Sequence, residues 1–119
     1  MSDLKEKFYE QLARHLVKWR DAGVQAVKDP ATADWLEMPL AAQRLHAKGW
    51  TTQELEDLRS LLSECCGGVL HATLVTLDGG SALADTGNVT LVDAATGKEL
   101  TDGALHEEFA EVLARKGLI

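Results

Sequence analysis

The chain has 119 residues, of which 45% are apolar and 26% charged, and its net charge is −7 at pH 7. This length suits one domain with its own core, and the near-average composition excludes disordered and fibrous classes. No apolar run approaches the roughly 20 residues that cross a bilayer, and the charged segment 1–7 lacks the apolar core of a secretion signal. We therefore expect a single cytoplasmic domain over residues 1–119, without a membrane partner.

The first predicted element is a helix from Asp3 to about Lys28. Apolar residues recur in it at steps of three or four, which marks one face of a helix. They are Leu4, Phe8, Leu12, Leu16, Trp19, Gly23 and Val27. Asp29-Pro30 ends this helix, because Pro fixes φ and is accepted at the first position of a new one.

Shorter helices are expected next, between Pro30 and Trp50, with Pro39 dividing them and Gly49 as a left-handed cap. Thr51-Thr52-Gln53-Glu54 matches the capping box and opens a third, long helix. Its apolar residues at helical spacing are Leu55, Leu58, Leu61, Leu62 and Cys65. Gly67-Gly68 is expected to stop it.

The composition then changes towards β-branched residues, and residues 69–77 are predicted as a strand covered on both faces. A turn follows at 78–80 and an irregular loop runs to Gly87. Further strands are predicted at 88–93 and 98–100, joined by a tight turn through 94–97.

The last predicted helix begins near Thr101-Asp102 and ends at Gly117. Its inward residues are Leu105, Phe109, Val112 and Leu113. Helices before strands favour an α+β fold, because parallel strands need helical crossovers. We expect three or more N-terminal helices, a small, mainly antiparallel sheet of about three strands covered on one face, and a C-terminal helix. An exposed edge of that sheet makes a homodimer a further possibility.

Negative charge is concentrated after residue 50. Residues 1–50 carry eight Lys/Arg and seven Asp/Glu, whereas residues 51–119 carry four and twelve, a net of −8. Such a surface repels phosphate backbones, which disfavours direct nucleic-acid binding, and it attracts a basic protein partner. Acidity that only keeps the protein soluble is the alternative explanation.

No motif specifies a reaction. The four histidines are His15, His46, His71 and His106. No two of them have a metal-ligand spacing such as HxH or HxxxH, so we predict no metal ion and no cofactor. A disulfide between the adjacent Cys65 and Cys66 could not join distant parts of the chain. We therefore expect reduced thiols, with one of them in the core.

His71 is the one candidate for a catalytic residue. As a general base it needs a carboxylate from elsewhere, since Asp78 lies roughly 23 Å further along an extended strand. A histidine hydrogen-bonded in or beside the core is the simpler explanation. The alternative function is a small-molecule-binding protein or minor enzyme with a pocket near His71, lined by carboxylates from the loop 79–87.

The leading hypothesis is a protein-interaction module whose acidic surface docks a basic protein partner and masks, for example, a nucleic-acid-binding site. The carboxylates expected to form this surface are Glu54, Asp57, Asp78, Asp85, Asp93, Glu107, Glu108 and Glu111. Trp35, which lies between two prolines, is the tryptophan expected to be exposed.

Residues 74–85 (LVTLDGGSALAD) and 105–109 (LHEEF) resemble a pattern found in small uncharacterised bacterial proteins. This resemblance implies no activity, so no residue role follows from it. The small size and acidity are similar in class to toxin-immunity proteins and phage-encoded inhibitors of bacterial defence, which implies binding to a protein target.

Overall fold

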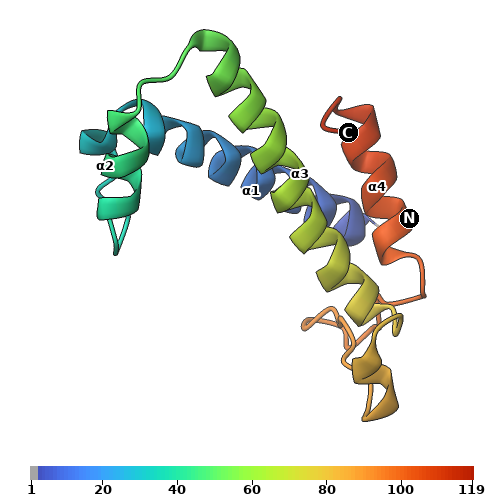
Figure 1. Cartoon of the computed structure of the whole chain (residues 1–119). Helices are drawn as coiled ribbons and strands as arrows, with labels where there is room; N and C mark the ends of the chain where they lie inside the picture. The colour runs from blue at the N-terminus through green and yellow to red at the C-terminus, as the bar shows by residue number, and fades with distance from the viewer. Residues whose placement is uncertain (1–2) are drawn as a thin grey trace. The chain divides into compact units, whose positions relative to one another are not determined.

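The computed structural model describes residues 3–119, and the protein is all-helical, with 67% helix and 2% strand (Figure 1). The chain divides into two compact units, one made of residues 1–14 with 67–119 and the other of residues 15–66. Helices α1 (Asp3–Lys28) and α3 (Thr52–Leu77) each contribute residues to both units.

Helix α1 confirms the predicted first helix from Asp3 to Lys28. Its early residues Tyr9 and Ala13 are buried in the first unit, and its later residues Val24 and Val27 are buried in the second. Helical spacing therefore gave the extent of α1 but little of its buried face, since of the predicted apolar stripe only Leu16 and Val27 are buried, whereas Leu4 and Trp19 are exposed.

The second unit contains the two short helices expected between Pro30 and Trp50. They are the 3₁₀ helix η1 (Pro30–Thr32) and helix α2 (Leu40–Ala47). Gly49 follows α2 with φ of +72°, as expected of a left-handed cap. The small core between these helices and α1 consists of Ala26, Ala33 and Ala42, with Leu36 packed against it.

The prediction of an exposed Trp35 is confirmed. Its indole lies edge-on to that of Trp19, with ring centroids 5.3 Å apart. The prediction for the cysteines is only partly right, because both thiols are free but Cys65 is exposed and Cys66 half-buried. Neither cysteine lies in the core.

The predicted α+β fold is wrong, and α3 is the main reason. Gly67-Gly68 does not stop this helix, which continues to Leu77 through the predicted strand 69–77. Neither glycine has the positive φ that ends a helix. The hydroxyls of Thr73 and Thr76 donate to backbone carbonyls four residues earlier, so β-branched side chains are accommodated here.

No sheet forms within residues 3–119. The predicted strands 88–93 and 98–100 meet only at one antiparallel bridge, between Val92 and Glu99. The turn at 94–97 is confirmed, with φ of +73° at Gly97. Among the described residues there is accordingly no sheet edge through which two copies could pair.

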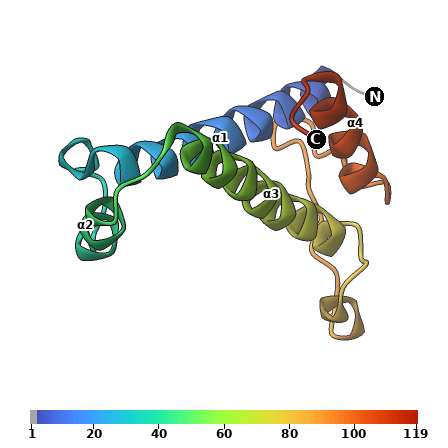
Figure 2. The same cartoon turned by 45° about the horizontal axis from the view of Figure 1, so that its top comes forward.

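The first unit contains the short 3₁₀ helix η2 (Ala82–Asp85) and helix α4 (Leu105–Arg115). Figures 1 and 2 both show α4 beside the N-terminal end of α1. There the rings of Tyr9 and Phe109 have centroids 6.0 Å apart. The four predicted inward residues of α4 are all buried, and Gly117 follows the helix with φ of +69°.

Helix α3 is exposed along much of its length. Of the most apolar 18-residue window in the segment Thr52–Asp85, only 6% is buried. By length and composition this is the one described helix that meets the requirement for crossing a bilayer, a test that core helices of soluble proteins also pass. The segment reaches this length because the predicted helix and the predicted strand join into one helix, and the expected cytoplasmic location stays a prediction.

Candidate functional site

The second unit carries a pocket beside the first half of α3. Its volume is about 270 Å³, its walls are mostly apolar, and its lining residues are Trp50, Glu54, Asp57, Leu58 and Leu61. The four residues from α3 are spaced i, i+3, i+4 and i+7, which places them on one face of the helix. An apolar bed with two carboxylates suits a Lys or Arg side chain, because its stem is apolar and its head is cationic.

Local hydrogen bonds hold the parts of this pocket in place. The indole Nε1 of Trp50 donates to the backbone carbonyl of Leu45 at 2.7 Å, which fixes the ring. The capping box is confirmed: the Thr51 N–H donates to Glu54 Oε1 at 2.9 Å, and the Glu54 N–H donates to Thr51 Oγ1 at 3.1 Å. The pocket is therefore organised before any partner arrives.

The pocket carries negative charge at neutral pH. Hydrogen bonds from the backbone and side chain of Thr51 lower the pKa of Glu54. Asp57 accepts a hydrogen bond from the Gln53 side chain at 3.0 Å. Both residues are exposed, so their carboxylates can meet a cation from solvent.

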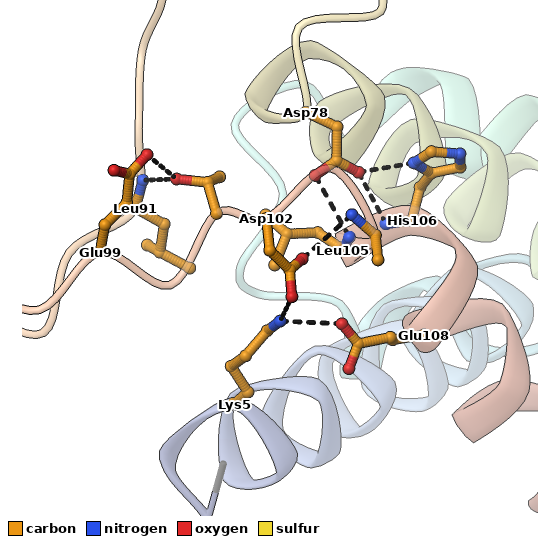
Figure 3. A network of polar contacts seen from close by, with 10 residues as sticks. Lys5, Asp78, Leu91, Glu99, Asp102, Leu105, His106 and Glu108 are labelled. Atoms are coloured by element: carbon orange, nitrogen blue, oxygen red, sulfur yellow. Dashed lines mark hydrogen bonds and ion pairs between the residues drawn. The ribbon is translucent and has the colours of Figure 1, made fainter. Parts of the chain in front are cut away.

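The first unit contains a separate polar network around Asp78, which follows the end of α3 (Figure 3). The Asp78 carboxylate accepts from the backbone N–H groups of Leu105 and His106, at 3.2 and 3.0 Å. It also lies 2.5 Å from Nδ1 of His106. Its side chain is only 3% exposed. The buried Asp78 carboxylate therefore holds the start of α4 in place through hydrogen bonds.

Lys5 forms a second part of this network and is 5% exposed. Its ammonium group donates to Asp102 at 2.9 Å and to Glu108 at 2.8 Å (Figure 3). Burial disfavours the charged ammonium, but the two carboxylates outweigh this effect and raise the pKa of Lys5. The hydrogen bond from Lys5 in turn lowers the pKa of Asp102.

Tyr9 lies fully buried in the same unit, and its hydroxyl has no hydrogen-bond partner among the described residues. Burial, followed by the negative charge of Glu108, raises the pKa of Tyr9 to about 12. This hydroxyl is an uncompensated polar group, which costs folding free energy.

The eight predicted partner-binding carboxylates are divided by the structure. Glu54 and Asp57 belong to the second unit, and the other six belong to the first. In the first unit Asp78 is buried and Glu108 is bound to Lys5, so these two are engaged within the protein. Those that are exposed there are Asp85, Glu107 and Glu111. Asp93 is half-buried and accepts from the Ala95 N–H, which shapes the 94–97 turn.

His71 lies on α3 rather than in a strand, and it is exposed. It does not line the pocket beside Trp50. Its ring lies edge-on to that of His106, with centroids 5.5 Å apart. The expected separation of His71 from Asp78 in an extended strand is wrong, because two helical turns shorten it and His106 stands next to both.

Several residues of these sites were not predicted from the sequence. Trp50 was not singled out, and Leu58 and Leu61 were noted only for their helical spacing. The spacing of Glu54, Asp57 and Leu58 on a capped helix was the available signal for a mixed acidic and apolar face. The chain offered no comparable signal for Lys5, because its carboxylate partners lie about a hundred residues away. The same holds for Tyr9, whose ring packs beside the equally distant Phe109.

No family model, curated protein or solved structure matches this chain. The resemblance in residues 74–85 and 105–109 therefore stays a prediction.

Proposed function

We propose that this protein is an interaction module that captures a Lys or Arg side chain of a basic protein partner in the pocket beside Trp50. The observation that carries the proposal is the placement of two exposed carboxylates, from Glu54 and Asp57, on a mostly apolar pocket. The leucines and the indole would receive the alkyl stem, and the carboxylates would receive the charge.

The charge of the chain supports a cationic occupant. Residues 51–66, the part of the acidic half that lies in the same unit as the pocket, carry four Asp/Glu and only one Lys/Arg. A cation over an indole face gains a further attraction of roughly 0.5–2 kcal/mol. A second copy of this chain is a poor occupant, because like charges at an interface repel each other.

The fixed geometry of the pocket also supports binding. Ordering a flexible side chain on association costs roughly 0.5–1.5 kcal/mol. The Trp50 ring and the Glu54 carboxylate already have hydrogen-bond partners within the chain. The cost of ordering these two side chains is therefore largely part of the folding of the second unit and does not oppose binding.

A site-specific crosslink tests the proposal. Leu61 lines the pocket and is 57% exposed, so it is replaced by p-benzoylphenylalanine in the full chain within native host cells. Leu83, an exposed residue of η2, carries the same group as the matched control. We expect a basic protein to be captured from position 61 and not from position 83.

The same crosslink in an E54Q/D57N background distinguishes recognition of charge from non-specific hydrophobic binding. We expect this neutral variant to lose most of the captured product, because the cation no longer finds its counter-charge. A product that survives in E54Q/D57N, or one that also forms from position 83, contradicts the proposal. So does capture of an acidic protein.

A further inference from the structure

The edge-on contact between His71 and His106 joins two metal-binding side chains that are far apart in sequence. His71 comes from α3 and His106 from the first turn of α4, and their ring centroids lie 5.5 Å apart with an interplanar angle of 84°. His71 is exposed, and the His106 side chain is 26% exposed, so an ion can reach both from solvent.

We propose that His71 and His106 together bind a divalent transition metal ion of the zinc class, with Asp78 as the positioning residue for His106. Imidazole nitrogens suit Zn²⁺, Ni²⁺ and Cu²⁺. With metal–nitrogen bonds of about 2.0–2.1 Å, two imidazoles on one ion have ring centroids roughly 5–6 Å apart. The observed separation falls within this range.

Asp78 determines which nitrogen of His106 is available. Its carboxylate lies against Nδ1 and also accepts from two backbone N–H groups, so its orientation is fixed. Because this carboxylate engages Nδ1, Nε2 is the nitrogen of His106 that remains for a metal ion. This carboxylate–histidine arrangement is the one that orients ligating imidazoles in zinc sites.

The remaining ligands come from outside this pair. Among residues 3–119 no three His, Cys, Asp or Glu side chains are placed to hold one ion, so water completes the coordination shell. Glu107 Oε1 lies 3.9 Å from Nε2 of His106, and the Glu107 side chain is 76% exposed. Its negative charge lies on the side of the ring where the ion would sit.

Zinc titration of the full chain tests the proposal, with isothermal calorimetry as the readout. A C65S/C66S background removes the two free thiols, which bind the same metals. We expect stoichiometric Zn²⁺ binding that weakens by more than about tenfold in H71A, through loss of a ligand, and by about 10–100-fold in D78N, through loss of orientation. The exposed His15 of the other unit provides the control, and H15A should bind as the parent does.

Nitrogen-15 spectra of the histidine side chains supply a second readout. Zn²⁺ should shift Nε2 of His106 together with a ring nitrogen of His71, and it should leave His15 and His46 unchanged. In metal-free D78N the His106 spectrum should show loss of the single tautomer, which a purely structural role for Asp78 would not predict. Because His71 is exposed, H71A should keep the helical circular dichroism of the parent.

Two outcomes overturn the proposal. The first is unchanged Zn²⁺ affinity in folded H71A, which means that the two rings contact each other edge-on without sharing an ion. The second is Zn²⁺-induced shifts at His15 or His46 as large as those at His71 and His106, which means that the histidines bind independently.

Discussion

Asp78 lies 2.5 Å from Nδ1 of His106 although the two residues are 28 positions apart in the chain. Helix α4 follows Ala104, whose side chain cannot cap a helix. Asp78 supplies this missing cap from the end of α3, by accepting from the N–H groups of Leu105 and His106. The carboxylate thus links two helices of the first unit and meets the positive end of the α4 dipole.

Replacing Asp78 should therefore destabilise the first unit. We expect D78A to lower the free energy of unfolding by about 1–3 kcal/mol, because two backbone donors and one imidazole lose their acceptor. Denaturant unfolding followed by circular dichroism measures this change. Asp85 is exposed in η2, and the control D85A should stay within about 0.5 kcal/mol of the parent. Equal effects of the two variants would contradict the capping role.

The Lys5 network predicts a pH-dependent contribution to stability. K5M should cost roughly 1–3 kcal/mol near neutral pH, because Glu108 is left with a partly buried, unpaired charge. The folded pKa of Asp102 is lowered, so its contribution is present above its unfolded value of 3.8 and is lost as pH falls through the folded value. The folded pKa of Lys5 is raised, so its contribution is present below 10.5 and is lost as pH rises through the folded value.

The difference in unfolding free energy between the parent and K5M should consequently be flat across neutral pH and shrink at both extremes. Urea unfolding at a series of pH values gives this difference directly. K7M removes an exposed lysine of the same helix and is the matched control. A difference for K5M that stays constant down to acid pH would show that Lys5 acts through packing alone.

At Tyr9 a substitution is expected to raise the free energy of unfolding and not to lower it. Y9F removes a buried hydroxyl that has no hydrogen-bond partner among residues 3–119, and we expect it to raise the free energy of unfolding by about 1 kcal/mol. The raised folded pKa makes the parent lose stability between pH 10 and about 12, and Y9F should lack this loss. Thermal unfolding at neutral and alkaline pH tests both statements. A less stable Y9F would mean that the hydroxyl has a hydrogen-bond partner in solution.

Two glycines of the long helices should respond differently to alanine. A Cβ on Gly68 meets nothing within 4 Å, so G68A should stabilise α3 by up to about 1 kcal/mol through helix propensity. A Cβ on Gly23 lies 2.8 Å from Cδ1 of Leu62, so G23A should gain less or lose stability. Chemical unfolding of the two variants in parallel decides this. A destabilised G68A would show that α3 does not run as a continuous helix through the glycines.

The α3 result shows where sequence reasoning succeeds and fails. The extent of α1, the capping box at Thr51, and the left-handed Gly49 and Gly117 were predictable, because each depends on contacts within a few residues. The continuation through Gly67-Gly68 was not, since helix formation is cooperative and a glycine costs only about 1 kcal/mol. Because α3 continues through residues 69–77, the strand predicted there does not form.

The sites were predictable only in part. Glu54 and Asp57 were expected to bind a partner, and they line the pocket on which the proposed function rests. Asp78 was expected at the surface, but its role depends on the start of α4, which is far away in sequence. Long-range pairs such as Lys5 with Glu108 leave no local pattern, because no periodicity connects them.

The pocket beside Trp50 is proposed to recognise a cationic side chain. The most direct measurement is a proton–nitrogen NMR titration of the full chain with N-acetylarginine amide, compared with the uncharged, similarly shaped N-acetylcitrulline amide. We predict that the arginine compound shifts the indole N–H of Trp50 and the amides of Leu58 and Leu61, and that E54Q/D57N abolishes these shifts. Equal shifts from the citrulline compound, or shifts that persist in E54Q/D57N, would contradict the account.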